Sequence, residues 1–306
     1  MVVVGLGLHR PLSESERAPI EAASPWPVLD HDPDGCVDMG EVNGTPCQVH
    51  PAFVEAEVIL TVGRVELHQY AGFSGGHKGV AVGCGGRDTL AALHARELVC
   101  HADVEVGRLA GNPFRAAVDA LGEHIGVAFA LQYTASGCWI GGPPTEALRV
   151  AAEAEDPWLI VPTLHDEVVI RCPGRKAANF YQASRAATYL ALSPSPPLRP
   201  GARLVLEAAC PEGMGRGSGE QAFARLLRET GDLRTLLSGE VPSGAGLQRA
   251  FMLARLQQRG YRLLVTGCEA VPELVACGIE ATDEPAATSA SLVVGEPFRK
   301  LPQAPT

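Results

Sequence analysis

The sequence predicts an α/β protein built from two domains with mostly parallel sheets. Short runs of aliphatic residues alternate with segments of helical periodicity, an order typical of β-α-β units with parallel strands. The 306 residues suffice for two domains of ordinary size. Aromatic residues make up only 5% of the chain, and cores of small aliphatic side chains suit helices packed on a parallel sheet.

The first domain is expected over residues 1–156. Val2–Val4 is an apolar run followed by glycine, which predicts a buried strand. Ser13 and Glu16 have the spacing of a capping box and should begin a helix. The other elements expected here are strands over 56–62, 65–67 and 127–131, loops over 25–35 and 72–86, and helices over 89–99 behind an Asp88 N-cap, over 113–122 behind an Asn112 N-cap and over 146–155.

Asp156-Pro157 should end the last of these helices, and we take it as the domain boundary. The second domain, over 157–288, is expected to be a smaller α/β unit. Residues 289–306 should form a C-terminal strand and tail that could return to the first domain. Strands are expected over 158–161, 167–171, 203–208, 261–265 and 292–294, and helices over 177–190, 221–229, 246–259 and 271–276.

Charge and cysteine content narrow the class of partner and compartment. The formal net charge is −10, so a large basic patch is not expected and nucleic acid is disfavoured as a partner. Nine cysteines without a C-x-x-C pair or zinc-ligand spacing favour buried free thiols and a reducing compartment. The N-terminus lacks the basic start of a signal peptide, and no apolar stretch approaches the ~20 residues that span a membrane. We therefore expect a cytoplasmic protein without a membrane partner.

The densest group of chemically capable residues runs from His68 to Lys78, with the sequence His-Gln-Tyr-Ala-Gly-Phe-Ser-Gly-Gly-His-Lys. Its glycines let backbone N–H groups approach an anion, Ser74 adds a hydroxyl donor, and the two ends supply a base and a nucleophilic amine. The glycines are Gly72, Gly75 and Gly76. Because the segment does not match a Walker A loop, a solvated turn with a surface lysine is an alternative that the residues alone leave open.

Three further residues are candidates on weaker grounds. His94 is expected within the helix over 89–99, where a single histidine is more often structural than a metal ligand. His9 and Arg10 follow the first strand, and residues at the carboxyl ends of parallel strands commonly line a ligand crevice. They could serve as an acid/base group and an anion clamp, or His9 could be an ordinary loop histidine.

Taken together, these segments resemble the nickel-pincer lactate racemase family from about Leu6 to Val294. The strongest element is His68 with Ala-Gly-Phe-Ser-Gly-Gly-His-Lys78, followed sixteen residues later by His94. Further segments that fit are Leu6–Pro11, Gly111–Pro113, Phe180–Ala186 and Glu207–Gly215. Several motifs in one order are more specific than a single glycine loop.

The resemblance implies a cofactor, a pyridinium bis-thiocarboxylate mononucleotide that holds nickel through sulfur, carbon and sulfur. Lys78 would form the covalent thioamide link to this nickel pincer nucleotide. His94 would be the protein's own ligand to nickel, in a roughly square-planar site of the kind that Ni(II) accepts. The residues around the cofactor would be Gly72, Ser74, Gly75 and Gly76.

The resemblance also implies a reaction, the racemisation or epimerisation of a small 2-hydroxy acid in the cleft between the two domains. His9 and His68 would be the acid/base groups, one on each side of the substrate, while the cofactor takes up and returns hydride. The second domain would close over the substrate. The substrate-binding residues would be Arg10, Tyr181, Gln182 and Arg185.

Three departures from the family pattern bear on this activity. Arg185 stands where the family usually has lysine, and because a guanidinium grips carboxylate with two bonds, we expect a larger substrate or one with a second acid group. The segment Gly246–Ala250 stands where the lactate enzymes carry an aromatic residue. The family's N-terminal segment with an Asp-x-Thr-Arg motif has no counterpart here, which leaves open a misassigned start codon, a separate chain that supplies the missing part, or a reduced and inactive relative. A homo-oligomer is a further partner that we leave open.

Two other functions stay open on the sequence alone. A relative that binds the cofactor but has lost turnover would account for the absent N-terminal motif. A phosphate-loop transferase that uses Lys78 as a point charge would account for the glycines, and it would carry neither nickel nor a covalent adduct.

Overall fold

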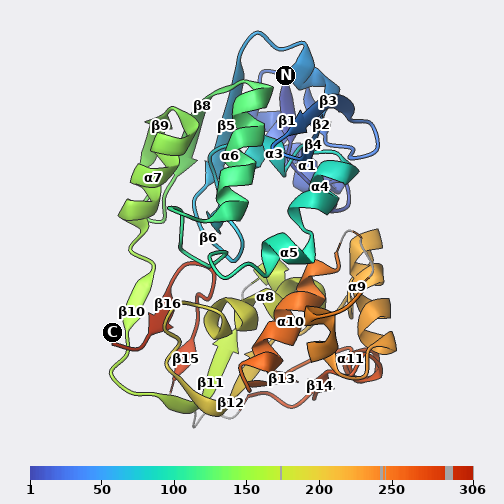
Figure 1. Cartoon of the computed structure of the whole chain (residues 1–306), viewed down its shortest axis with the longest axis vertical. Coiled ribbons are helices and arrows are strands. Elements are labelled where there is room, and N and C mark those ends of the chain that lie inside the picture. Colours follow the sequence, from blue (N-terminus) through green and yellow to red (C-terminus); the bar gives the residue numbers. More distant parts are fainter. Residues whose placement is uncertain (173, 242–243, 245, 287–291, 306) are drawn as a thin grey trace.

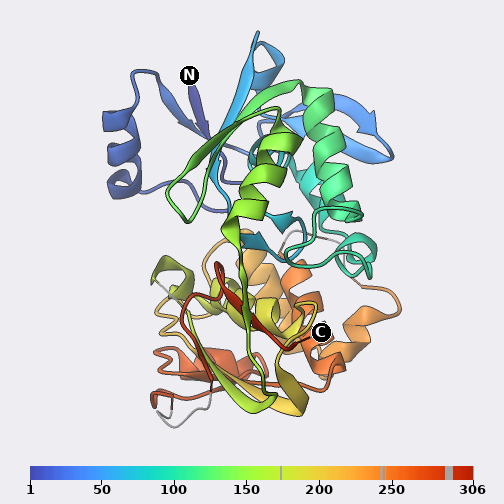
Figure 2. The same cartoon turned by 90° about the vertical axis from the view of Figure 1, so that its left-hand side faces the viewer.

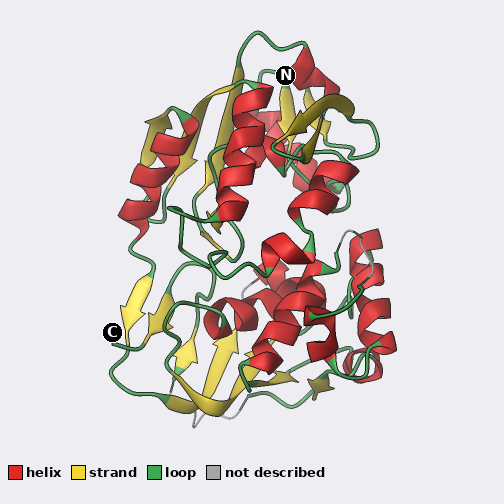
Figure 3. Ribbon diagram, in the orientation of Figure 1, coloured by secondary structure: helices red, strands yellow, loops and turns green. Residues whose placement is uncertain are grey.

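The computed structural model describes residues 1–172, 174–241, 244, 246–286 and 292–305. The chain forms two halves, one of N-terminal residues drawn blue to green and one of the residues beyond about 157, drawn yellow to red (Figure 1). Helices alternate with strands in both halves (Figure 3), and most strand pairs of the described residues are parallel, which confirms the predicted α/β class. Among the described residues, no helix combines the length and the apolar character needed to cross a membrane.

The N-terminal half contains several small sheets. Its strands are β1 (Val2–Val4), β2 (Val28–Asp30), β3 (Val37–Val42), β4 (Thr45–Val49), β5 (Ile59–Arg64), β6 (Leu67–His68), β7 (Gly72–Phe73), β8 (Val127–Tyr133) and β9 (Trp139–Gly142). Strand β1 runs parallel to β2 and β5 runs parallel to β8, whereas the pairs β3–β4, β6–β7 and β8–β9 are antiparallel. The helices are α1 (Glu14–Ala23), α2 (Pro51–Val54), α3 (Lys78–Ala81), α4 (Arg87–Leu93), α5 (Arg96–Val99), α6 (Pro113–Ile125) and α7 (Pro144–Glu155).

Capping residues place two of these helices where the sequence predicts them. Ser13 caps α1, and Glu16 completes the capping box. Asn112 caps α6, where its side chain accepts a hydrogen bond from the backbone N–H of Arg115. Both helices therefore begin where a polar side chain satisfies backbone donors that have no partner within the helix.

The helix predicted over 89–99 is wrong in two respects. Helix α4 begins at Arg87 with Gly86 as its N-cap, so Asp88 is not the cap; its carboxylate instead accepts from the side chain of Gln48. The helix also ends at His94, and α5 is a separate helix that begins at Arg96. His94 is thus a helix-terminal residue, and its ring is free to bond back along α4.

In the N-terminal half, strands β2, β3, β4, β7 and β9 were not predicted. β2 lies within the expected loop over 25–35. The hairpin of β3 and β4 turns at Asn43-Gly44, and both residues have positive φ angles of 51° and 78°. Asn-Gly is the preferred sequence for such a turn, so this was a local signal that the sequence analysis overlooked.

The C-terminal half is built on a five-stranded parallel sheet with the order β14-β13-β12-β11-β15. The strands are β10 (Trp158–Ile160), β11 (His165–Arg171), β12 (Leu198–Glu207), β13 (Arg262–Thr266), β14 (Glu280–Ala281), β15 (Val293–Val294) and β16 (Leu301–Gln303). The helices are α8 (Phe180–Ala191), α9 (Ser218–Glu229), α10 (Gln248–Gln258) and α11 (Val271–Ala276), with 3-10 turns at Gly174–Ala177 and Leu233–Leu237. Helices α8 and α10 lie between this sheet and the N-terminal half, as both views show (Figures 1 and 2).

The C-terminal strand does not return to the first domain as expected. Val293 of β15 pairs with Val169 of β11, so this strand forms one edge of the five-stranded sheet. There it satisfies backbone groups of β11 that would otherwise lack partners. Strand β16 pairs with β10, and only the tail reaches the other half, where Arg299 donates to the carbonyl oxygen of Ala135 at 3.4 Å. The predicted division at residue 288 lies outside the described residues.

Candidate functional site

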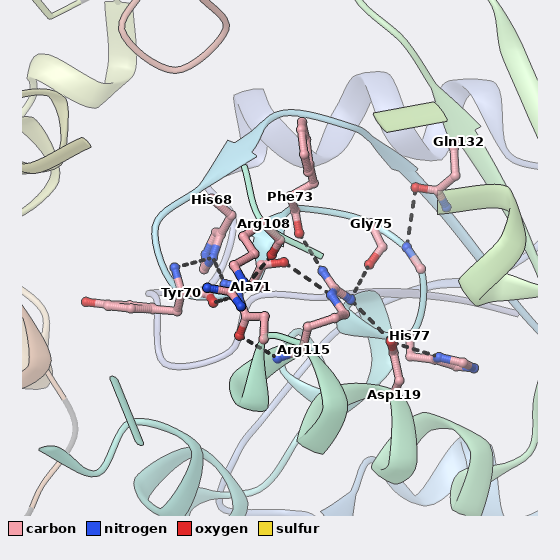
Figure 4. A network of polar contacts seen from close by, with 12 residues as sticks. His68, Tyr70, Ala71, Phe73, Gly75, His77, Arg108, Arg115, Asp119 and Gln132 are labelled. Carbon is pink, nitrogen blue, oxygen red and sulfur yellow. Dashed lines mark hydrogen bonds and ion pairs between the residues drawn. The ribbon is translucent and has the colours of Figure 1, made fainter. Parts of the chain in front are cut away.

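The segment 68–78 turns back on itself as β6 and β7, and helix α6 holds it (Figure 4). The buried Arg115 of α6 donates to three of its carbonyl oxygens and pairs with Asp119 at 3.4 Å. The accepting residues are Ala71, Phe73 and Gly75. Asn112 donates to the carbonyl oxygen of Tyr70 at 2.8 Å. Since each backbone oxygen has a charged or polar donor, the loop conformation is specified by α6.

Two glycines of the loop are required by packing. Gly72 has φ +73°, and a Cβ atom there would lie 2.0 Å from the carbonyl oxygen of Arg108. Gly75 has φ +105°, and its Cβ would lie 2.1 Å from Oε1 of Gln132. No other residue fits either position without moving its neighbours. The close approach is thus to the protein itself, and the placement of Gly72, Gly75 and Gly76 around a cofactor stays a prediction.

Ser74 joins the two ends of the hairpin. Its hydroxyl donates to the carbonyl oxygen of Arg64 at 2.8 Å and accepts from the backbone N–H of Glu66 at 2.9 Å. A serine hydroxyl carries one proton, and this proton is used within the protein. The expectation that Ser74 offers a donor to a bound anion therefore finds no support in its contacts.

His68 is held in one tautomer by its own loop. Its Nδ1 accepts from the backbone N–H groups of Tyr70, at 3.4 Å, and Ala71, at 3.1 Å. Because backbone N–H groups only donate, Nδ1 carries no proton and the proton of the neutral ring sits on Nε2. Burial and the nearby cations, Lys78 first among them, lower the pKa of His68 well below its ordinary value. The ring is thus a neutral Nε2–H donor.

His94 has the opposite tautomer. Its Nδ1 lies 2.7 Å from the carbonyl oxygen of Leu90 and must donate to it, so Nε2 keeps its lone pair. Burial lowers the pKa of His94 to about 4, and the ring is therefore neutral near pH 7. A neutral imidazole whose second nitrogen is fixed by a carbonyl is the arrangement that metal-ligating histidines use.

Lys78 begins α3 directly after the loop. Burial, followed by the positive charges of Arg185, Arg115 and Arg249, lowers the pKa of its amine to about 7. A substantial share of the side chain is therefore the neutral amine at neutral pH, and this is the form that acts as a nucleophile.

His9, Gln182 and Arg185 form a chain across the two halves. Arg185 Nη1 lies 3.3 Å from Gln182 Oε1, and Gln182 Nε2 lies 3.5 Å from His9 Nδ1. Desolvation by the surrounding protein, followed by the cations Arg185, Arg249 and Lys78, lowers the pKa of His9 to about 4. His9 nevertheless keeps contact with solvent, and its long contact to Gln182 leaves the tautomer free to change.

Arg10 does not join this group. Its guanidinium pairs with Glu16 at 2.7 Å, and its side chain is 61% exposed. Glu16 raises the pKa of Arg10 through a hydrogen bond and its charge. The role of anion clamp that we expected for Arg10 is therefore not supported, because the guanidinium already binds a carboxylate of the protein.

Arg249 was not predicted as a site residue, although the sequence drew attention to its segment. It is 7% exposed, and its guanidinium carbon lies 5.6 Å from the ring centre of Tyr70 and 5.5 Å from that of Tyr181. Tyr181 accepts a hydrogen bond from Gln248 at 3.1 Å. Arg249 belongs to no recognisable sequence motif, so only its burial on α10 identifies it as a candidate site residue.

The predicted centre is brought together from distant parts of the chain. The positive charge of Arg249 contributes to lowering the pKa of four residues: His9, His68, Lys78 and His94. The rings of His68 and His94 lie 5.7 Å and 5.9 Å from that of Tyr70. The group therefore combines neutral imidazoles, a partly neutral amine and unneutralised guanidinium groups, a composition suited to an anionic ligand.

Of two surface hollows, one lies away from this group of residues and the other includes a single member of it, His9. One of about 350 Å³ adjoins the start of α6 and includes Asn112 but none of the predicted catalytic residues. The other, of about 430 Å³, includes His9 and reaches Gly217 and Ser218 at the start of α9. Within the described part of the chain, no three His, Cys, Asp or Glu side chains are arranged to hold a metal ion. A metal beside His94 would need its other ligands from a bound group.

Comparison with known proteins agrees with the motifs. Residues 1–107 match the family described as the lactate racemase N-terminal domain. The lactate racemase of Lactiplantibacillus plantarum is 28% identical over 118 residues, which are 36% of this chain and 28% of that protein. The match thus spans less than a third of the curated relative.

Two solved structures share the fold. The lactate racemase apoprotein of Thermoanaerobacterium thermosaccharolyticum has a TM-score of 0.81 at 18% identity, covering 98% of this chain and 78% of its own. A protein of Thermotoga maritima has a TM-score of 0.76 at 15% identity, covering 99% of this chain and 85% of its own. At these identities the matches establish the architecture alone.

Proposed function

We propose that the chain racemises or epimerises a small 2-hydroxy acid, because its residues 1–107 match the lactate racemase N-terminal domain family and it is 28% identical to a lactate racemase over 118 residues. The observation that supports this most is that Lys78 and His94 belong to one group of residues and are suited to complementary roles. One offers a partly neutral amine, and the other offers a neutral imidazole with a free Nε2 lone pair in the same group of residues.

These two residues fit a nickel pincer nucleotide. Lys78 would bind its organic part covalently, and His94 would ligate its nickel through Nε2. When bound, this group would supply a centre that takes up and returns hydride. The unpaired N–H groups of Arg185 and Arg249 are suited to the carboxylate and phosphate charges of such ligands.

The two histidines proposed for proton transfer are not equivalent. His68 presents Nε2–H and can donate to the substrate oxygen, since its Nδ1 is held by two backbone N–H groups. His9 is not held in one tautomer, and with its pKa near 4 it is neutral and able to accept a proton at pH 7. We assign the removal of the hydroxyl proton to His9 and the polarisation of the same oxygen to His68.

The substrate would lie between the loop 68–78 and helices α8 and α10, in the cleft expected between the two domains. Arg185 would bind the carboxylate next to the reacting carbon, because its Nε has no partner in the protein. Gln182 connects Arg185 with His9, so a carboxylate held there would bring the 2-hydroxyl group near the base. Tyr181 would close one side of this space.

The alternatives are less well supported. A phosphate-loop transferase needs free donors in the glycine loop, but Ser74 is engaged and the glycines at 72 and 75 are committed to packing.

The nine free thiols agree with a reducing compartment, and we retain the cytoplasm as part of the proposal. A homo-oligomer or a separate partner chain is likewise a proposal.

Co-expression with the enzymes that make the nickel pincer nucleotide tests the proposal. Intact-protein mass spectrometry should show an adduct that Lys78→Ala abolishes, and the loaded protein should interconvert the enantiomers of at least one 2-hydroxy acid. An adduct without interconversion of any acid in a broad panel would identify a cofactor-binding relative without turnover. If the co-expressed protein carries neither the adduct nor nickel, the proposal is refuted.

A further inference from the structure

Arg249 is a buried cation whose hydrogen-bonding capacity is largely unused. Its Nε and Nη1 atoms are buried and have no hydrogen-bond partner, and the residue is 7% exposed. A buried guanidinium without a counter-charge is costly, so its unused donors call for an explanation, and an anionic ligand would supply one. The rings of Tyr70 and Tyr181 flank it at 5.6 Å and 5.5 Å and offset part of this cost without neutralising the charge.

Arg249 lies close to the part of α8 that carries Arg185, because its guanidinium carbon is 5.5 Å from the ring centre of Tyr181, one helical turn before Arg185. Both contribute to lowering the pKa of His9, His68 and Lys78. Arg185 Nε is also without a partner, while its other nitrogens reach Gln182, at 3.3 Å, and Tyr189, at 2.7 Å. This group of residues therefore includes two guanidinium groups with free donors, whereas a monocarboxylic acid brings only one anionic group.

From this arrangement we infer that Arg249 forms a second anion subsite, which binds a second acid group at the far end of the substrate. The inference rests on the proposed function, in which Arg185 binds the carboxylate beside the reacting carbon. A 2-hydroxy dicarboxylate would satisfy both guanidinium groups at once. It would also leave neither cation buried without a partner.

The subsite is formed by residues from both halves of the chain. Tyr70 comes from the loop 68–78 and donates from its hydroxyl to the carbonyl oxygen of Gln248 at 3.5 Å. Gln248 in turn donates to Tyr181, and its own Oε1 has no partner. The two rings and the backbone of α10 thus fix the guanidinium in place, so that little ordering is left for the moment of binding.

The same donors could receive the phosphate of a nucleotide, and titration of the purified chain distinguishes the two sources. Malate and 2-hydroxybutanoate share four carbons and a 2-hydroxyl group, but only malate has a second carboxylate. In isothermal titration calorimetry, malate should bind at least tenfold more tightly than 2-hydroxybutanoate. Inorganic phosphate should bind more weakly than malate; if it binds more tightly and depends on Arg249, the subsite belongs to a phosphate and the inference is wrong.

Substitution shows which residue carries the preference. Arg249→Gln should lower the affinity for malate tenfold or more and change the affinity for 2-hydroxybutanoate less than twofold. Arg255→Gln removes a positive charge from the same helix, where Arg255 donates to the carbonyl oxygen of Val99 at 3.4 Å, and should leave both affinities unchanged. Equal weakening of both acids by Arg249→Gln would overturn the inference.

Thermal unfolding separates ligand binding from a structural role. If Arg249 is kept for a ligand, Arg249→Gln should leave the Tm of the ligand-free protein unchanged or raise it, and it should abolish the rise in Tm that malate causes. If Arg249→Gln lowers the Tm of the ligand-free protein and abolishes the binding of both acids, Arg249 only supports the fold. If malate is preferred through Arg249 but co-expression with the cofactor-making enzymes gives no adduct on Lys78, the proposed function is refuted and the subsite stands.

Discussion

The Nδ1 atom of His94 lies 2.7 Å from the carbonyl oxygen of Leu90, one helical turn earlier in the chain. This contact is made because α4 ends at His94, and it leaves the lone pair of Nε2 unused. The lowered pKa keeps the ring neutral. One backbone oxygen thus prepares the only imidazole that we assign to a metal.

Removal of this imidazole should separate nickel binding from attachment of the organic cofactor. His94→Ala is expected to lose nickel but keep the covalent adduct on Lys78, since the thioamide does not require the metal. Inductively coupled plasma mass spectrometry and intact mass report the two events. His101→Ala is the control, because His101 is exposed beside Asp103; nickel retained at the unaltered level in His94→Ala would refute the ligand assignment.

The amine of Lys78 should react at a lower pH than an ordinary lysine. The chain has three lysines, Lys78, Lys176 and Lys300. A pulse of acetic anhydride labels only the neutral amine, so labelling of Lys78 should rise as the pH passes through about 7, whereas an ordinary lysine is labelled only near pH ~10. Peptide mass spectrometry measures the labelling of Lys78, and a midpoint near the ordinary lysine value of pH ~10 would contradict the effect of burial.

Arg115 should be the main support of the loop 68–78. Arg115→Met leaves three carbonyl oxygens of the loop without their charged donor and leaves the Asp119 carboxylate with His77 as its remaining side-chain contact. Breaking such a buried pair costs about 3–5 kcal/mol, which urea denaturation measures. Arg149→Met removes an exposed arginine that pairs only with residues of its own helix and should hardly move the midpoint.

Two glycine substitutions separate backbone strain from crowding. Gly40 has φ +87° with nothing within 4 Å of a Cβ atom, so Gly40→Ala should cost only the left-handed conformation, about 1–2 kcal/mol. Gly72→Ala meets the same strain and also the carbonyl oxygen of Arg108 at 2.0 Å. It should destabilise the protein more and weaken adduct formation at Lys78. If Gly40→Ala and Gly72→Ala lower the free energy of unfolding equally, the loop can shift away from the carbonyl oxygen of Arg108 and relieve the clash.

Much of the architecture and several site residues could be predicted from local patterns. The capping pairs at Ser13 and Asn112, the parallel strands and the loop 68–78 all depend on residues within a few positions of one another. Strand β2 could not be predicted in this way, because its partner strand β1 lies outside its own segment. The end of α4 at His94 carries no Gly, Asn or Pro stop signal in the sequence.

What the sequence determined by itself is the alternation of strands and helices, the glycine loop with its lysine, and the resemblance that these motifs carry. The tertiary structure alone decided which of the candidates meet. It pairs Arg10 with Glu16, and it brings Arg249 to Lys78 from 171 positions away. The physical reason is that a pKa, a tautomer or an unpaired donor depends on whatever atoms lie within a few ångströms, and most of those atoms belong to distant parts of the chain.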